Sequence, residues 1–300
     1  MKLVYGHTDS IYVQMPMDKA EETRDLLNNH VRNAFPNLLE LDDHPITLEF
    51  EKYFKSLGVG ITKNRNAGLI SWKDGNYLDE PEFTMTGFTA KRIAQTDLEK
   101  KTQLEILRMW VEGKSELEIT TTLKLKYNTI STGNIELKTL INRSRYRPER
   151  FIYKCKHCNV QSTVEELLNH NCASYCFKCG NDTSLVTLEG KNPSIGSGVE
   201  GVMWWNQNRN NKLVDSYIYI RIMDDPIRTL YRNPLNGVYK RPTYISAPNE
   251  KNLLDCNITP DYYHYAEAIV KKAKPIYEAM GWDFTQIRQD INQKTLDEWW

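Results

Sequence analysis

The stretch LVYGHTDSIYVQM, residues 3–15, has the pattern of a β-hairpin with a carboxylate at its tip. Gly6 permits a tight turn, and Asp9 and Ser10 are residues that turns favour. From Ile11 onward apolar and polar residues alternate, which is the period-two pattern of a half-buried strand. We therefore predict a hairpin whose tip presents Asp9, a position from which a carboxylate can hold a metal ion.

The same residues resemble motif C of the family B DNA polymerases, which usually reads Tyr-Gly-Asp-Thr-Asp-Ser. The residues that match it are Tyr5, Gly6, Thr8, Asp9 and Ser10, and His7 replaces the first aspartate. The resemblance implies that Asp9 binds two Mg²⁺ ions together with an aspartate of motif A, while His7 occupies a supporting position. Because an imidazole nitrogen suits Mn²⁺ or Zn²⁺ better than Mg²⁺, we expect impaired catalysis or a shift towards Mn²⁺.

Length and charge limit the class of protein. Three hundred residues suffice for two or three compact domains. Basic and acidic residues number 39 each, so a surface that binds nucleic acid must be local. The sequence contains neither an apolar run of membrane-spanning length nor a signal peptide. We expect no membrane partner and a cytoplasmic location, at the nucleoid or replication site, or in the host cytoplasm for a viral protein.

Residues 1 to about 80 have a β-α-β-β pattern, so the fold class is predicted to be α+β. Residues 18–35 have apolar residues at helical spacing, with Asp18 as the expected N-cap. These apolar residues are Leu26, Leu27, Val31 and Phe35. Residues 46–72 are rich in β-formers and read as two or three strands with a break at Gly58–Gly60.

The segment LEFEKYFKSLGVGITKNRNAGL, residues 48–69, resembles palm strands of the same polymerases. In that family a Lys-Lys-Arg-Tyr-Ala-Gly-Leu element lies on the primer–template duplex; here its first four positions are Lys63, Asn64, Arg65 and Asn66. Two of the four differ, so we expect a weaker contact. Lys63 and Arg65 are predicted to bind backbone phosphates. A solvent-exposed strand end is the alternative interpretation.

Two further segments follow the family's order. Residues 87–119 resemble the passage from palm to thumb, with a basic pair at Lys91 and Arg92 and a helix that starts after Thr96 or Asp97. One apolar stripe on that helix is predicted to pack in the core, namely Leu104, Leu107, Trp110 and Val111. Residues 259–282 resemble the final thumb helix.

Two motifs of these polymerases do not occur in the sequence. These are motif A, which supplies another metal-binding aspartate, and motif B, the Lys-rich helix that grips the incoming nucleotide. We therefore expect the chain to be the small subunit of a split polymerase. A larger subunit would carry the exonuclease, the fingers and motifs A and B. A truncated gene or a fragment is the alternative.

Five of the six cysteines fall between positions 155 and 179. Cys155 and Cys158 form one Cys-x-x-Cys pair, and Cys176 and Cys179 form a second. This spacing is typical of a zinc ribbon, in which four thiolates hold a structural Zn²⁺. The less favoured candidate ligands are Cys172, His170 and His157, and simple reduced thiols are the alternative.

The approach to this cluster, RSRYRPERFIYKCKHC at residues 143–158, contains six basic residues and one acidic residue. Arg143, Arg145 and Arg147 are predicted to bind DNA phosphates. The interleaved aromatic residues Tyr146, Phe151 and Tyr153 would suit an occasional stacked base. A solvent-exposed basic connector is the alternative.

The chain ends QKTLDEWW, which resembles the box by which replication proteins bind a sliding clamp. The residues that match are Gln293, Leu296, Trp299 and Trp300. Two adjacent tryptophans need burial, so they either fill a pocket of the clamp or pack onto the thumb. We favour the clamp.

The predicted organisation has five segments: the C-terminal half of the palm with motif C (1–85), the palm–thumb passage (86–150), a zinc ribbon insertion (151–185), the remainder of the mostly helical thumb (186–284) and the clamp-binding tail (285–300). The leading hypothesis is a small polymerase subunit that needs Mg²⁺ or Mn²⁺, Zn²⁺, primer–template DNA, the larger subunit and a clamp. The alternative is a catalytically inactive polymerase-derived adaptor that binds DNA and the clamp.

Overall fold

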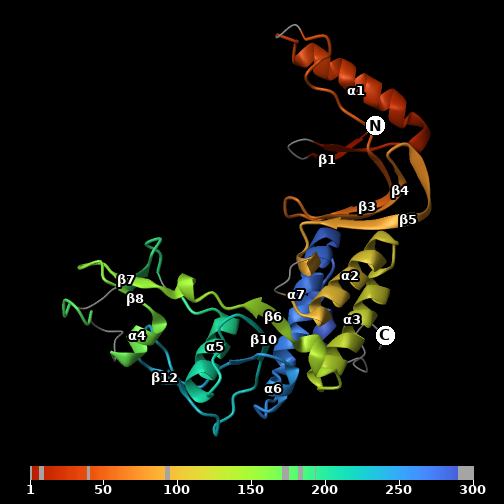
Figure 1. Cartoon of the computed structure of the whole chain (residues 1–300). Coiled ribbons are helices and arrows are strands. Elements are labelled where there is room, and N and C mark those ends of the chain that lie inside the picture. Colours follow the sequence, from red (N-terminus) through yellow and green to blue (C-terminus); the bar gives the residue numbers. More distant parts are fainter. Residues whose placement is uncertain are drawn as a thin grey trace. The chain divides into compact units, whose positions relative to one another are not determined.

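The computed structural model (Figure 1) describes residues 2–6, 10–38, 41–91, 95–170, 176–181, 185–192 and 194–289. Its elements in the first half of the chain are β1 Lys2–Gly6, β2 Ile11–Gln14, η1 Met17–Lys19, α1 Ala20–Ala34, β3 Lys52–Val59, β4 Asn66–Lys73, β5 Asn76–Thr86, η2 Thr89–Lys91, α2 Asp97–Val111, α3 Glu116–Ser131, η3 Leu137–Leu140, β6 Asn142–Arg145 and η4 Pro148–Phe151. The second half contains β7 Tyr153–Cys155, β8 Gln161–Ser162, α4 Val164–Asn169, β9 Leu185–Thr187, α5 Ser197–Asn208, β10 Ser216–Arg221, β11 Tyr231–Arg232, β12 Tyr239–Lys240, β13 Tyr244–Ala247, α6 Glu250–Leu254, α7 Tyr262–Met280 and η5 Phe284–Arg288.

These elements combine helices with small antiparallel sheets, so the predicted α+β class is confirmed. The chain divides into two compact units. The first comprises residues 1–89, 102–124 and 270–300, and the second comprises residues 90–101 and 125–269. The palm and thumb assignments and the five-segment division stay predictions.

The first unit contains the predicted hairpin and a three-stranded sheet in the order β3-β4-β5. Strands β1 and β2 pair antiparallel, with Gly6 opposite Ile11. The hairpin is held beside β3 because the Tyr12 and Phe54 rings lie 5.9 Å apart and the Tyr53 hydroxyl donates to the Met15 carbonyl at 3.0 Å.

The break expected at Gly58–Gly60 is wrong for Gly58, which lies inside β3. A Cβ at Gly58 would lie 2.5 Å from the Trp110 ring, so the glycine allows the indole to pack against the strand. Backbone pairing resumes after a turn, in which the Gly60 N–H donates to the Arg65 carbonyl at 2.8 Å.

Helix α1 confirms the helix expected within residues 18–35, but its start differs from the prediction. Its N-cap is Lys19 rather than Asp18, because the chain enters through the 3₁₀ turn η1, and no side chain caps the helix. Its buried residues are Ala20 and Asn28, whereas the apolar residues Leu26 and Phe35 are exposed. The Asn28 side chain instead exchanges hydrogen bonds with the Leu48 backbone at 2.7 and 2.9 Å.

Helix α2 begins as predicted after Thr96, which forms a capping box with Glu99. Leu107 and Val111 of the predicted stripe are buried together with Ile106, while Leu104 is 39% exposed, so that part of the prediction is wrong. Helix α7 confirms the helix expected near residues 259–282.

In the second unit, strands β6, β10 and β13 form an antiparallel sheet in the order β13-β10-β6. Helix α5, drawn in teal in Figure 1, packs closely on this sheet because Gly198 and Gly201 face it without side chains. A Cβ at Gly201 would lie 2.4 Å from the Ser246 hydroxyl, and the same hydroxyl donates to the Gly198 carbonyl at 2.7 Å.

Gly87 is expected to be the least replaceable glycine of the first unit. It has φ of +75°, and a Cβ there would overlap the Asn64 carbonyl oxygen. Gly87→Ala should lower the free energy of unfolding by about 2–4 kcal/mol, because steric overlap adds to the left-handed backbone penalty. Urea denaturation would measure this loss. Gly75→Ala is the matched control, since Gly75 has φ of +89° but open space around it, and should cost about 1 kcal/mol. Equal losses in both variants would contradict the steric explanation.

Candidate functional site

The strands on both sides of the predicted metal-binding tip are in place. Gly6 ends β1 and Ser10 precedes β2. His7, Thr8 and Asp9 lie outside the described residues, so their predicted roles stay predictions. The hairpin prediction itself is confirmed.

Tyr5 joins the hairpin to the turn between β3 and β4. Its hydroxyl donates to the Asn64 side-chain oxygen at 2.9 Å, and the Asn64 backbone N–H donates to the same hydroxyl at 3.1 Å. Asn64 has φ of 62°, a left-handed conformation that asparagine tolerates better than most residues. Asn64, which departs from the family's sequence, therefore links the hairpin to this turn.

That turn also carries Lys63 and Arg65. Lys63 is exposed and Arg65 is half-buried, while Asn66 is buried as the first residue of β4. The structure thus brings two predicted site elements, the motif C hairpin and the basic turn, together within the first unit. Lys91 ends η2, and Arg92 lies outside the described residues.

The four paired cysteines converge in the second unit. Their sulfur atoms all lie within 4.8 Å of one another. Cys155 Sγ is 3.9 Å from Cys179 Sγ, and Cys158 Sγ is 3.5 Å from Cys176 Sγ. These separations exclude disulfides, in which the sulfurs lie about 2.05 Å apart. They match the edge of about 3.8 Å expected for four sulfurs at about 2.3 Å from a central Zn²⁺.

Both Cys-x-x-Cys pairs sit on equivalent knuckle turns. The Asn159 N–H donates to the Cys155 carbonyl at 2.9 Å, and the Gly180 N–H donates to the Cys176 carbonyl at 2.8 Å. Asn159 and Gly180 both have left-handed φ, which asparagine and glycine adopt readily. The predicted four-thiolate arrangement is therefore present, with a donor set that fits Zn²⁺.

Hydrogen bonds prepare one of these thiols to bind a metal. Burial raises the pKa of Cys176, but the backbone N–H groups of Cys179 and Lys178 and the neighbouring thiols lower that pKa to about 6. For Cys158, the Val160 N–H lowers the pKa, yet burial and the surrounding thiols raise it to about 11. A Zn²⁺ ion would hold all four as thiolates, releasing protons as it binds.

In the described part of the chain, the less favoured candidate ligands are not part of the group of metal-ligating atoms. The His170 ring stacks on Phe177 with the centroids 4.6 Å apart, and the His157 backbone N–H donates to Cys155 Sγ at 3.4 Å. Cys172 lies outside the described residues. The group of potential metal ligands found among the described residues consists of the four paired cysteines.

A small hydrophobic cluster supports the cysteine site. Tyr153 of β7 and Leu167 of α4 are buried at its centre. Leu235, from the turn between β11 and β12, packs against the same cluster and ties the ribbon to the rest of the second unit. So small a cluster supplies little stability on its own, which is why such ribbons depend on their metal.

The basic strand before the ribbon is exposed, as a DNA contact requires. Arg143 and Arg145 alternate with half-buried residues on β6, which is an edge strand, and Arg147 is also exposed. The prediction that Tyr153 could stack on a base is wrong, because its side chain is only 1% exposed within the ribbon core. Tyr146 and Phe151 stack on each other, with the centroids 5.5 Å apart.

The predicted clamp-binding residues Gln293, Leu296, Trp299 and Trp300 lie outside the described residues. Among the helices that the structure describes, none combines the length and the apolar character needed to cross a membrane.

Comparison with known proteins adds an independent observation. The sequence matches the sequence model of DNA polymerase family B over residues 1–280. It is 27% identical over 140 residues to the DNA polymerase zeta catalytic subunit of Arabidopsis thaliana, covering 47% of this chain and 7% of that protein. It is 28% identical over 188 residues to DNA polymerase 037L of Invertebrate iridescent virus 6, covering 57% of this chain and 15% of that protein. The matches thus span a small part of the length of either relative.

Proposed function

The chain belongs to DNA polymerase family B, and from this premise we propose that it is the small subunit of a split DNA-directed DNA polymerase. It supplies Asp9 to a two-metal nucleotidyl-transfer site that a polypeptide with motifs A and B completes. The observation that carries this proposal is the hydrogen-bonded link between the motif C hairpin and the basic turn, through Tyr5 and Asn64.

In the proposed reaction, the hairpin binds the metal ions and the basic turn binds the duplex. Polymerases of this family use divalent metal ions, which lower the barrier to phosphoryl transfer by neutralising developing charge. Asp9 offers the carboxylate oxygens that Mg²⁺ prefers, and His7 tunes the site towards Mn²⁺. Lys63 and Arg65 bind phosphates of the primer–template duplex. Because Tyr5 connects the hairpin to this turn, the metal site and the duplex keep a fixed register.

The need for a partner is supported by the apolar surface of residues 2–50. In the described part of the chain β1 and β2 pair only with each other, and a two-stranded hairpin is marginally stable alone. Large apolar side chains remain exposed there, namely Leu3, Val4, Ile11, Leu26, Phe35, Leu38, Leu41 and Ile46. We propose that the polypeptide with motifs A and B covers this surface and completes the palm.

Binding of the partner polypeptide tests whether it covers the apolar surface of residues 2–50. Leu3→Glu should weaken binding of the partner polypeptide on primed DNA by at least about tenfold, because burial of a leucine contributes about 2 kcal/mol. Titration with a labelled partner would measure the affinity. Leu117→Glu is the matched control, since Leu117 of α3 is 75% exposed and Leu3 is 64% exposed. Unchanged affinity in Leu3→Glu would place the partner elsewhere.

The remaining predicted parts complete the proposal. The zinc ribbon has a structural role, residues 86–150 and 186–284 grip the duplex as a thumb, and Gln293, Leu296, Trp299 and Trp300 bind a sliding clamp at the site of replication. The second candidate function, an inactive adaptor that binds DNA and the clamp, is favoured by His7 in motif C. The two candidates differ in whether function requires Asp9.

A further inference from the structure

A cavity of about 190 Å³ in the second unit combines two arginines with an exposed aliphatic side chain. Its walls come from the end of α5, from the turn before β11 and from the segment after α6. The residues that line it include Trp204, Arg209, Asp225, Ile227, Arg228 and Cys256. The proposed function assigns none of these side chains an individual role.

The sequence Asp225-Pro226-Ile227-Arg228 forms the turn on one side of this cavity. The Arg228 N–H donates to the Asp225 carbonyl at 3.0 Å, and proline at the second position suits such a turn. The Trp204 indole N–H donates to the Thr229 carbonyl at 2.9 Å, which ties the turn to α5. Ile227 occupies the third position of the turn, where it is 89% exposed.

Arg228 is the buried arginine of the cavity. Its side chain is 6% exposed and lies 3.4 Å from the Asp225 carboxylate. Its guanidinium also donates to the carbonyls of Cys256 and Asn257, at 3.1 and 3.0 Å. Arg228 thus holds the end of α6 against the turn. Its Nε is buried and has no hydrogen-bond partner among the described residues, an arrangement that a nearby acceptor would stabilise.

Arg209, the residue after α5, carries a charge that no carboxylate of the described residues balances. Its guanidinium carbon lies 5.7 Å from the Trp204 ring and 5.8 Å from the Trp205 ring, within the range of cation–π contacts. It donates to Cys256 Sγ at 3.6 Å, and a thiol is a weak acceptor. The cavity therefore presents a guanidinium that is held in place and has N–H donors to spare for an anion.

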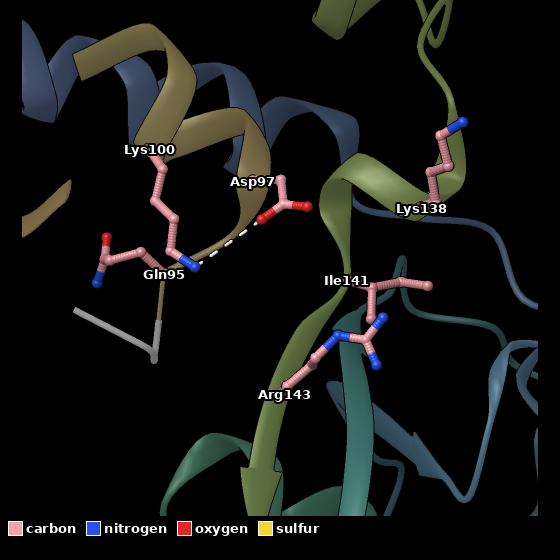
Figure 2. Close-up of a pocket in the computed structure, with 6 residues that line it drawn as sticks. All are labelled: Gln95, Asp97, Lys100, Lys138, Ile141 and Arg143. Atoms are coloured by element: carbon pink, nitrogen blue, oxygen red, sulfur yellow. Dashed lines mark ion pairs between the residues drawn. The ribbon is translucent and has the colours of Figure 1, made fainter. Parts of the chain in front are cut away.

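A second cavity in the same unit, of about 80 Å³, lacks such an arrangement (Figure 2). Lys100 and Arg143 line it, and Lys100 Nζ lies 3.8 Å from Asp97. Figure 2 shows the ammonium group of Lys138 turned away from both of these side chains. Because its cations do not converge, we assign no anion site to the second cavity.

We propose that the cavity around Arg209 binds the carboxylate of an aspartate or glutamate from a partner protein, while Ile227 contacts an apolar neighbour of that residue. Charge complementarity favours a carboxylate, because a planar guanidinium can bind its two oxygens through parallel hydrogen bonds. Arginine is also enriched among the residues that contribute most to protein–protein binding. An exposed isoleucine beside it supplies the apolar contact that a peptide offers and a free ion does not.

The surroundings of Arg209 favour a protein over a nucleic acid. Asp225 lines the cavity, and Asp255, which precedes Cys256, is exposed. A nucleic-acid strand brings a row of phosphates, which these carboxylates would repel. A peptide brings one carboxylate and an apolar side chain, which match Arg209 and Ile227.

Selection from a random peptide library tests the chemistry of this partner. The full chain would select from phage-displayed heptapeptides, with the Arg209→Gln chain used for counter-selection. Enriched peptides should contain an aspartate or glutamate next to a leucine, isoleucine or phenylalanine. A synthetic copy of the most enriched peptide should bind Arg209→Gln at least about tenfold more weakly than wild type in fluorescence anisotropy, because the partner's charge loses its counterpart.

Ile227→Glu separates docking from a change in the fold. Because Ile227 is 89% exposed, its replacement leaves the packing intact, yet it puts a carboxylate beside Arg209. Peptide binding should weaken at least about tenfold. Val214→Glu is the matched control, since Val214 is 70% exposed and does not line the cavity, and its affinity should stay within about twofold of wild type.

Three outcomes would overturn the proposal. The first is a selection that does not enrich acidic residues over the starting library. The second is equal peptide affinity in Ile227→Glu and wild type. The third is a short duplex DNA that displaces the peptide from wild type and binds Ile227→Glu more weakly, which would assign the cavity to nucleic acid. These measurements need neither primer extension nor the polypeptide with motifs A and B, so they are independent of the proposed function.

Discussion

Replacing Asp9 by alanine should abolish primer extension by the chain assembled with the polypeptide that carries motifs A and B. In the proposed function, Asp9 is the motif C carboxylate that this chain contributes to the two metal ions. Loss of such a ligand removes several kcal/mol of transition-state stabilisation, so the single-turnover rate should fall by about a thousandfold or more. Affinity for primed DNA should stay within about twofold, because phosphate contacts supply that affinity.

A matched variant distinguishes loss of chemistry from loss of charge. Asp18→Ala removes a carboxylate from η1, at an exposed position close in sequence to the hairpin, and should leave the rate unchanged. If Asp9→Ala extends primers as fast as wild type, the adaptor hypothesis replaces the polymerase hypothesis.

Replacing Cys155 by serine should release one zinc ion per chain and unfold the ribbon. The four sulfurs are the donor set that the described residues offer, and Cys155 is buried among them. Structural zinc contributes about 10–16 kcal/mol to small domains of this kind, far more than the cluster around Tyr153 and Leu167 can supply. The zinc content per chain, measured by metal analysis, should fall to nearly zero. The backbone amide hydrogens of β7 and α4 should exchange rapidly with solvent.

The sixth cysteine gives the control. Cys256 is buried outside the cluster, where Arg209 donates to its sulfur at 3.6 Å. Cys256→Ser should keep one zinc ion per chain and the exchange protection of the ribbon. A Cys155→Ser chain that retains zinc would mean that another ligand replaces the thiolate. A wild-type chain without zinc would contradict the metal assignment outright.

Features that depend on neighbouring residues were predictable from the sequence. The hairpin follows from alternation around Gly6, and the knuckle turns follow from the Cys-x-x-Cys pairs with Asn159 and Gly180 after them. The hairpin and the knuckle turns depend on contacts between residues that are close in sequence, so the local sequence pattern predicts both directly.

Features that depend on distant residues were not predictable. The helical spacing of the apolar residues in residues 18–35 predicts the helix but not their exposure, since Leu26 is 49% exposed and Phe35 is 58% exposed. The prediction that Asp18 is the N-cap is wrong because Asp18 lies in the 3₁₀ turn η1, which precedes the helix. In the sequence, Tyr153 is an aromatic residue within a basic segment, which is also the pattern of residues that stack on bases. Only the fold shows that Tyr153 packs against Leu167.

The site divides in the same way. Arg143 was predictable from its basic segment, whereas its place in one cavity lining with Lys100 of α2 depends on the fold. The role of Asn64 was likewise hidden, since the hydroxyl that it binds lies on Tyr5, 59 residues away.

The most direct measurement is primer extension by the wild-type chain mixed with the polypeptide that carries motifs A and B, with Mg²⁺ and Mn²⁺ in parallel and each polypeptide also alone. We expect extension in the mixture only, with Mn²⁺ relatively more effective because of His7. Absence of extension with either ion, despite a stable complex of both polypeptides on primed DNA, would contradict it.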